Sequence, residues 1–306
     1  MSSIPEEICR EVLHLAPRRI EPVRPHLARI VTDAHVVYVK HGRAADTGGR
    51  FGLEAWAYRQ CRAHGVPAPD VLAASRAGDA LDYVATLALA GRSLWVKPAL
   101  SGASLTRVLR AAGEQLRALH EIRIDGFGPL VPVAGSRPRG EHARWCPFVG
   151  IAHARALPCL VDTGALSADE AAAIRTRFVD AEPALRRDVP GRLLHGDLEG
   201  DHLFSHRGRF TGFIDFEKLQ AGDPCYDLAR IAWWDPHLLP ALLDGYGRDG
   251  LTADDLHVRM PAYLIANAVV VMAEEVRRDQ RRSDRAGKFI RIACSRDFSG
   301  LVPETK

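Results

Sequence analysis

Two acidic residues that follow apolar, strand-like runs constrain the fold of this chain most strongly. Asp197 comes after the run 192–194, and Asp215 comes 18 residues later, after the run 210–214. A possible metal ligand, His202, stands five residues after Asp197. Phosphoryl transfer from a nucleotide needs such a set: one carboxylate orients and deprotonates a hydroxyl, while another carboxylate and a neighbouring ligand hold Mg²⁺ on the phosphates. Each carboxylate by itself would be equally typical of a strand end that caps a turn.

Three stretches of sequence carry a family resemblance. They are His-Gly-Asp-Leu at 195–198, Ile-Asp-Phe at 214–216 and Gly-Asp-Pro-Cys-Tyr-Asp-Leu-Ala at 222–229. Together they resemble the aminoglycoside phosphotransferase family, which shares the protein-kinase-like fold and phosphorylates hydroxyls of antibiotics and other small molecules. The resemblance implies an α+β fold of two lobes. Residues 1–91 would form a small, β-rich, nucleotide-binding N-lobe, and residues 92–306 a larger helical C-lobe with the catalytic loop and the substrate-binding helices.

Sequence patterns predict the elements of both lobes. In the first 91 residues they indicate strands at 30–32, 36–40 and 81–89, a short helix at 6–15, a polar loop at 42–52 and a helix at 53–64. Apolar spacing then predicts helices at 104–120, 167–182, 236–247 and 252–282. Ser167 and Glu170 form the signature of a capping box, and Pro183 is expected to end or kink that helix.

Asp197 is the candidate catalytic base. In the family that the chain resembles, this position lies on a loop facing the substrate hydroxyl. Because phosphoryl transfer is loose, the base mainly positions the nucleophile. His195 is expected to support the loop by hydrogen bonds rather than to transfer protons. The resemblance gives Asp227 the task of bracing this loop, and Asp223, directly before Pro224, is placed to cap the next helix.

Asp215 and His202 are the candidates for a Mg²⁺ site. Asp215 matches the principal metal ligand of the family. His202 departs from the family pattern, in which asparagine is commoner, although some antibiotic kinases of the family also carry histidine here. Imidazole is a softer ligand than Mg²⁺ prefers. His202 therefore either binds the metal, which we favour, or hydrogen-bonds the loop while Asp215 and waters hold the ion.

The nucleotide, ATP or GTP, is expected to bind the N-lobe. Lys40 ends a β-branched strand from which a lysine can reach the α- and β-phosphates, and Glu54, on the following helix, can pair with it. The hinge that meets the nucleobase is expected at Thr86, Leu87, Ala88 and Leu89. No glycine stands between Arg24 and Lys40, so backbone amides cannot approach phosphates there as closely as in a glycine-rich loop.

Composition excludes several classes of partner. The net charge is only +3, and no dense basic block with interleaved aromatics is present, so no nucleic-acid partner is expected. Six scattered cysteines without a C-x-x-C pair indicate free thiols in a reducing cytoplasm. The N-terminus lacks the pattern of a secretory signal, and the apolar stretch 263–273 is too short to span a membrane. We therefore expect a cytoplasmic protein without a membrane partner.

The expected function is transfer of the nucleotide γ-phosphate to a hydroxyl of a small molecule, with an antibiotic or related natural product as the expected substrate. A protein kinase is disfavoured because Glu199 stands where protein kinases usually place a lysine. Residues 248–306 carry 9 acidic and 11 basic residues. This segment therefore lacks the excess of acidic residues that a pocket for a polycationic aminoglycoside needs. Two alternatives stay open: a kinase of a primary metabolite such as a sugar or amino alcohol, and a non-catalytic kinase-like binding module.

Aromatic residues offer a possible wall for the substrate. Five of them could line such a wall, and each could equally be an ordinary core residue. These five are Trp145, Phe148, Trp233, Trp234 and Tyr263.

Overall fold

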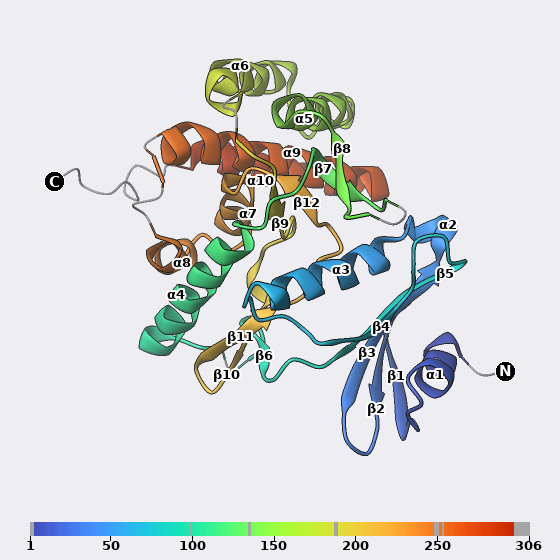
Figure 1. The fold of residues 1–306 in the computed structure, drawn as a ribbon. Helices are drawn as coiled ribbons and strands as arrows, with labels where there is room; N and C mark the ends of the chain where they lie inside the picture. The colour runs from blue at the N-terminus through green and yellow to red at the C-terminus, as the bar shows by residue number, and fades with distance from the viewer. Residues whose placement is uncertain are drawn as a thin grey trace.

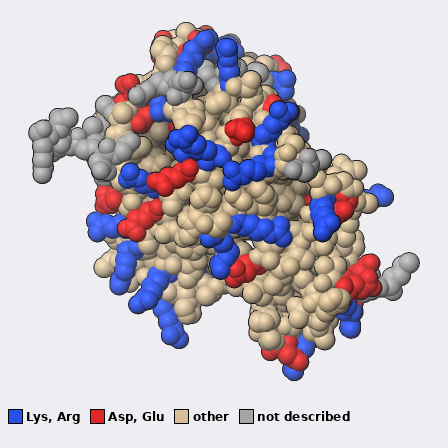
Figure 2. Space-filling view, in the orientation of Figure 1, with Lys and Arg blue, Asp and Glu red and all other residues tan. Residues whose placement is uncertain are grey.

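A computed structural model describes residues 3–97, 99–133, 136–186, 189–247, 251–252 and 254–296 of the protein (Figure 1). The side chains of residues 146–149 and 151–153, and with them the expected contribution of Phe148 to a substrate wall, lie outside the described residues. Basic and acidic side chains are mixed over the face shown in Figure 2, in keeping with the small net charge.

An antiparallel five-stranded sheet forms the N-terminal part of the fold. Its strands lie in the order β1 (Arg19–Arg24), β2 (Leu27–Val31), β3 (Val36–Arg43), β5 (Leu81–Leu87) and β4 (Val71–Ala74). The predicted strands at 30–32, 36–40 and 81–89 are thus confirmed, whereas β1 and β4 were not predicted. The expected helix at 6–15 appears as α1 (Ile4–Glu7) followed by the π-helical turn η1 (Ile8–Val12).

Both faces of this sheet are covered, because successive side chains of a strand point to opposite sides. Val84 packs with Phe51 and Ala55 of helix α3 (Arg50–Ala63) on one face. The next residue, Ala85, packs on the other face with Ile8 and Cys9. Helix α3 therefore lies against the sheet with a fixed orientation, and this positions the glutamate that it carries.

The expected polar loop at 42–52 is wrong in part. Strand β3 continues to Arg43, α2 spans Ala44–Thr47, and α3 begins at Arg50. The buried carboxylate of Asp82 accepts hydrogen bonds from the backbone N–H groups of Phe51 and Gly52, both at 3.0 Å. This residue lies about thirty positions away in sequence, so the start of α3 depends on a tertiary contact that local sequence does not reveal.

The C-terminal part is built from helices around α9 (Met260–Arg278). The others are α4 (Gly102–Leu119), α5 (Trp145–Asp162), α6 (Ala168–Leu185), α7 (Cys225–Trp234), α8 (Leu239–Tyr246) and α10 (Ser283–Ser295), with the short turns η4 (Asp255–Arg259) and η5 (Gln280–Arg282). Helices α5, α7 and α10 contact α9 (Figure 1). Helices α5 and α10 were not predicted. Helices α4 and α8 approach so closely that a Cβ at Gly113 would lie 2.0 Å from the carbonyl oxygen of Leu242.

The predicted capping box at the start of α6 is confirmed. The Ser167 side chain accepts the Glu170 N–H, and the Glu170 carboxylate accepts the Ser167 N–H. Of the two predicted effects of Pro183, an end of the helix is wrong, because α6 continues to Leu185, and a kink stays a prediction. Burial of Ala181 and Leu185 against the core holds this last turn.

One helical stretch, Asp255–Arg278, is long and apolar enough to cross a membrane by length and composition. In this fold 72% of its most apolar window is buried inside the molecule, as in the core helix of a globular protein.

Two small sheets hold the segments that carry the sequence motifs. Strands β8 (Arg139–His142), β7 (Phe127–Val131), β12 (Gln220–Gly222) and β9 (Arg192–Leu194) form one, and β11 (Arg209–Phe213), β10 (Leu203–His206) and β6 (Arg92–Ser93) form the other. The five-stranded sheet ends at Leu87, and β6 already belongs to a different sheet. A lobe boundary at residue 91 stays a prediction that this change of sheet supports.

Candidate active site

The loop after β9 is held by buried hydrogen bonds to Asp227. Its Oδ2 accepts the N–H of His195 at 2.7 Å, and its Oδ1 accepts the N–H of Gly196 at 2.9 Å. His120 contacts the same carboxylate through Nε2 at 3.1 Å. Burial raises the pKa of Asp227, but these hydrogen bonds and the nearby histidines outweigh burial and lower it below its usual value. Asp227 thus stays an anion that fixes the loop backbone.

Gly196 allows this loop to approach the segment that follows Asp215. Its φ is +79°, and a Cβ built there would lie 1.8 Å from the carbonyl oxygen of Lys218. Only glycine fits such a contact without moving one of the two backbones.

His195 uses both ring nitrogens inside the protein. Its Nδ1 accepts the N–H of Asp197 at 3.3 Å, so its Nε2 carries the proton and donates to the carbonyl of Ile214 at 2.9 Å. Burial lowers the pKa of His195 to about 4, which keeps the ring neutral. This geometry supports the predicted bracing role.

The carboxylate of Asp197 is flanked by two cations. Arg230 from α7 contacts Oδ1, and the Nζ of Lys218 lies 2.9 Å from Oδ2. Burial raises the pKa of Asp197, but Arg230 and Lys218 outweigh burial and hold the carboxyl below its usual value. Arg230 itself is buried and lies 5.6 Å over the rings of both Trp233 and Trp234.

Lys40 joins three carboxylates across the two parts of the fold. Its Nζ lies 2.9 Å from Glu54, 2.7 Å from Asp215 and 2.9 Å from Glu217. Burial alone would lower the pKa of Lys40, but the three carboxylates raise it above its usual value. The Tyr58 hydroxyl donates to Glu54 at 2.6 Å and accepts the N–H of Asp215 at 3.0 Å. The predicted lysine–glutamate pair is therefore assembled and tied to Asp215.

Asp215 has a backbone conformation that is uncommon for a residue other than glycine, with φ at +66°. Burial raises the pKa of its carboxyl, but Lys40 and His202 outweigh burial and lower the pKa to about 2. The Nδ1 of His202 donates to the carbonyl of Asp197 at 2.7 Å, so its Nε2 is the ring nitrogen that remains to face the carboxylates. That Nε2 lies 3.6 Å from Asp215 and 3.6 Å from Glu199.

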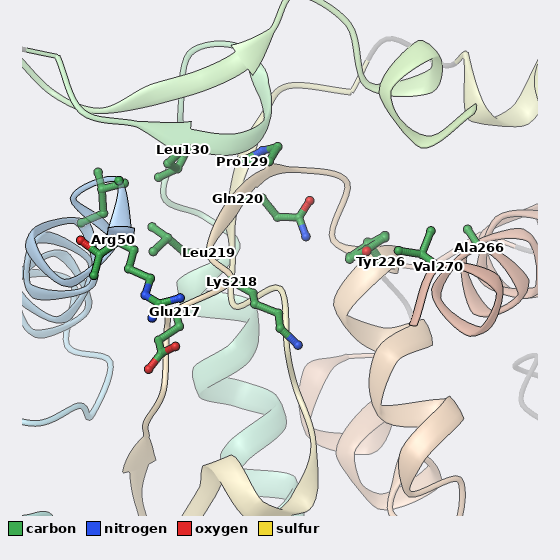
Figure 3. Close-up of a pocket in the computed structure, with 13 residues that line it drawn as sticks. Arg50, Pro129, Leu130, Glu217, Lys218, Leu219, Gln220, Tyr226, Ala266 and Val270 are labelled. Carbon is green, nitrogen blue, oxygen red and sulfur yellow. The ribbon is translucent and has the colours of Figure 1, made fainter. Parts of the chain in front are cut away.

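Two cavities open beside these groups. One, of about 190 Å³, is lined by Lys40 and Asp215 together with the predicted hinge Thr86, Leu87, Ala88 and Leu89. The N–H groups of Leu87 and Ala88 already donate to the carbonyls of Asp70 and Val36. A second cavity, of about 390 Å³, lies between the start of α3, strand β7, residues 217–220 and helices α7 and α9 (Figure 3).

Comparison with known proteins identifies the family. Residues 28–262 match the family described as "Phosphotransferase enzyme family". The chain belongs to this phosphotransferase family. Among curated proteins, hygromycin-B 4-O-kinase of Escherichia coli is 24% identical over 190 residues, covering 61% of this chain and 54% of that protein. Homoserine kinase of Methylobacterium sp. (strain 4-46) is 32% identical over 159 residues, covering 51% and 44%. The matched segments thus span about half the length of these relatives.

Solved structures share the fold of this phosphotransferase. A thermostable mutant of aminoglycoside phosphotransferase APH(4)-Ia, in a ternary complex with ADP and hygromycin B, has a TM-score of 0.70 at 19% identity, covering 96% of this chain and 98% of that one. A putative fructosamine-3-kinase from Thermobifida fusca YX-ER1 has a TM-score of 0.64 at 21% identity, covering 92% and 98%. The predicted two-lobed, kinase-like fold is confirmed.

The aromatic wall is not built as the sequence suggested. Trp145 and Tyr263 are buried in the phosphotransferase core, where the Trp145 Nε1 donates to the Tyr263 hydroxyl at 2.7 Å and that hydroxyl donates to Asp223 at 2.6 Å. Trp233 and Trp234 stack on each other beside Arg230. Tyr226 lines the larger cavity instead.

Sequence reasoning missed four residues of the phosphotransferase site: Tyr58, Glu217, Lys218 and Arg230. Glu217 and Lys218 directly follow the second motif, so their closeness to Asp215 was visible in sequence. Tyr58 stands one helical turn after Glu54, which is the spacing of side chains on one face. Arg230 gave no such signal, because only the docking of α7 brings it to Asp197.

Proposed function

We propose that this protein transfers the γ-phosphate of ATP or GTP to a hydroxyl of a small molecule. The observation that carries this proposal is the ion pair of Lys40 with Glu54 and Asp215, at 2.9 and 2.7 Å, next to a cavity lined by the hinge residues. Kinases need the lysine–glutamate pair and the metal-binding aspartate in place together. An assembled set of this kind supports an enzyme over a non-catalytic binding module.

Each residue has a role in this proposal. Asp197 accepts the hydrogen bond of the attacking hydroxyl and orients it, helped by the backbone bracing of His195 and Asp227. Lys40 binds the α- and β-phosphates, and Glu54 holds its ammonium in position. The N–H groups of Leu87 and Ala88 already donate to other parts of the chain. The hinge therefore meets the nucleobase through its backbone carbonyl groups and through Leu89.

The residues around Asp215 fit a magnesium ion. Ligand oxygens of Glu54, Asp215 and Glu217 lie within 4.8 Å of one another, and carboxylate oxygens are the ligands that Mg²⁺ prefers. The Nε2 of His202 lies 3.6 Å from both Asp215 and Glu199, an arrangement that a shared cation would stabilise. We propose that Asp215 and His202 hold Mg²⁺, with Glu217 beside them. When bound, the ion neutralises charge on the phosphates.

The acceptor is a hydroxylated small molecule. Relatives named for hygromycin B and for homoserine support two candidates: an antibiotic or related natural product, and a primary metabolite. The hygromycin-B kinase match covers more of this chain, 61% against 51%, whereas the homoserine kinase match has the greater identity, 32% against 24%, so both candidates are carried into the test. We propose a cytoplasmic site of action for either candidate.

The test is a panel of hydroxylated antibiotics, sugars, amino alcohols and hydroxy amino acids, offered with ATP and with GTP. Mass spectrometry should detect gain of one phosphate on at least one acceptor. Asp197→Asn is the matched control and should lower the rate about 10²–10⁴-fold, the range usual for a general base, while nucleotide binding persists. A variant that keeps more than about a tenth of the wild-type rate would remove Asp197 from this role.

A further inference from the structure

Two positively charged side chains line the larger cavity, the one beside the catalytic loop. Its charged side chains are Arg50, Glu217 and Lys218 (Figure 3). The carboxylate of Glu217 lies 2.9 Å from Lys40, whose ammonium it shares with Glu54 and Asp215. The buried Nε of Arg50 has no hydrogen-bond partner among the described residues, and the guanidinium lies 5.0 Å over the ring of Phe51. A buried donor of this kind is costly unless a ligand satisfies it.

Lys218 occupies the position that an acceptor hydroxyl must take. One oxygen of Asp197 is held by Arg230, whose side chain is 4% exposed and cannot move away easily. The other oxygen, Oδ2, is the one left for the hydroxyl, and the Nζ of Lys218 lies 2.9 Å from it. The Lys218 side chain is 56% exposed on a flexible stem, so the hydroxyl can displace it. The displaced ammonium then needs another anion.

We propose that the acceptor carries an anionic group, a carboxylate or a phosphate, besides its hydroxyl, and that Lys218 and Arg50 bind this group. The inference rests on the proposed phosphotransferase function. As the hydroxyl takes Oδ2 of Asp197, Lys218 moves to the anion of the same molecule. Arg50 supplies a fork of donors that matches a carboxylate or phosphate.

The rest of the cavity defines the body of the acceptor. Its remaining lining is largely apolar and includes Leu53, Leu130, Leu219 and Val270. An acceptor that fits is therefore an apolar hydroxy acid or hydroxyalkyl phosphate that fills part of about 390 Å³. A polycationic acceptor would meet two like charges there, and among the described residues Glu217 supplies the one carboxylate on the cavity wall.

The test uses 3-hydroxyalkanoic acids of medium chain length, their primary amides, the matching amino alcohols and the hydroxyalkyl phosphates. Phosphate gain by mass spectrometry reports transfer, and calorimetry with the MgADP-loaded protein reports binding without transfer. Charge-assisted hydrogen bonds of about 1.5–3 kcal/mol predict that acids exceed their amides about 10–100-fold in kcat/KM and in affinity. Comparison of the hydroxyalkyl phosphates with the hydroxyalkanoic acids shows whether the site prefers a phosphate or a carboxylate.

Two variants examine the anion-binding residues. In Lys218→Gln and in Arg50→Gln the preference for acid over amide should fall toward one. Arg59→Gln, an exposed arginine on the same helix α3, and Lys288→Gln, an exposed lysine on α10, are the matched controls and should retain the preference.

The outcomes separate this inference from the function on which it rests. Phosphate gain on amides or amino alcohols at rates equal to the acids overturns the inference and leaves the phosphotransferase intact. Preferential binding of acids without any phosphate gain overturns the proposed function and supports the anion site. If Lys218→Gln slows acids and amides equally, Lys218 serves the nucleotide phosphates and the inference fails.

Discussion

Replacing Arg230 by methionine removes a buried guanidinium from the carboxylate of Asp197, the proposed catalytic base. The Arg230 side chain is 4% exposed and contacts Asp197, whose side chain is 17% exposed. Removing one partner of a buried ion pair costs about 3–5 kcal/mol. Asp197 keeps Lys218 at 2.9 Å and some contact with solvent. We therefore expect the free energy of unfolding at pH 7 to fall by about 3 kcal/mol, at the low end of that range.

The size of this loss should depend on pH. In the wild type, the pKa of Asp197 is depressed because Arg230 and Lys218 outweigh the effect of burial. A carboxyl group whose pKa is lower in the folded state than in the unfolded state stabilises the fold at pH values above its unfolded-state pKa, about 3.9 for aspartate. This stabilisation is lost as the pH falls through the folded-state pKa. The stability difference between wild type and Arg230→Met should be full at pH 7 and shrink below about pH 4.

Urea unfolding at pH 7, 5 and 3.5 measures this difference. Arg59→Met, on the exposed side of α3, is the matched control. In kinetic assays the acid limb of kcat should move to higher pH, because Asp197 loses one of the cations that lower its pKa. A loss below about 1 kcal/mol at pH 7, or a loss that is equal at pH 7 and pH 3.5, would refute the assignment of Arg230.

Three further substitutions address the metal site and the loop. Asp215→Ala should abolish magnesium-dependent nucleotide affinity in calorimetry, and unchanged binding would show that Asp215 is not the ligand. His202→Asn should stay active and shift the metal preference from Mn²⁺ toward Mg²⁺, whereas an unchanged preference would leave His202 with the loop contact alone. Gly196→Ala places a Cβ 1.8 Å from the Lys218 carbonyl at a φ of +79°. It should lower the unfolding free energy by about 2–4 kcal/mol, and a loss under about 0.5 kcal/mol would contradict the close approach.

The sequence predicted the elements whose signals are local. Strands β2, β3 and β5 have alternating or β-branched residues, and the capping box of Ser167 and Glu170 lies within one helical turn. It missed β1 and β4, the outermost strands of the five-stranded sheet. Edge strands pair on one side only, and their sequences need less of the apolar alternation that reveals a buried strand.

The motifs by themselves predicted part of the set of residues that gather at the site. Asp197, Asp215, Lys40 and Glu54 were recognised because the order of carboxylates and lysine along the chain resembles that of the family and suits phosphoryl transfer. What the sequence could not give is the state of each group. The neutral ring of His195 arises from burial, and the low pKa of Asp215 arises largely from Lys40, which is far away in the chain.

The tertiary structure alone decided the charge around Asp197 and the larger cavity. Arg50, Lys218 and Arg230 stand on three separate segments, the start of α3, the stretch before β12 and helix α7. Only packing of these segments directs their charges toward Asp197 and the larger cavity. Local sequence specifies the residue types that chemistry needs, whereas the field at a site is a sum over neighbours that only the folded chain brings within a few ångströms.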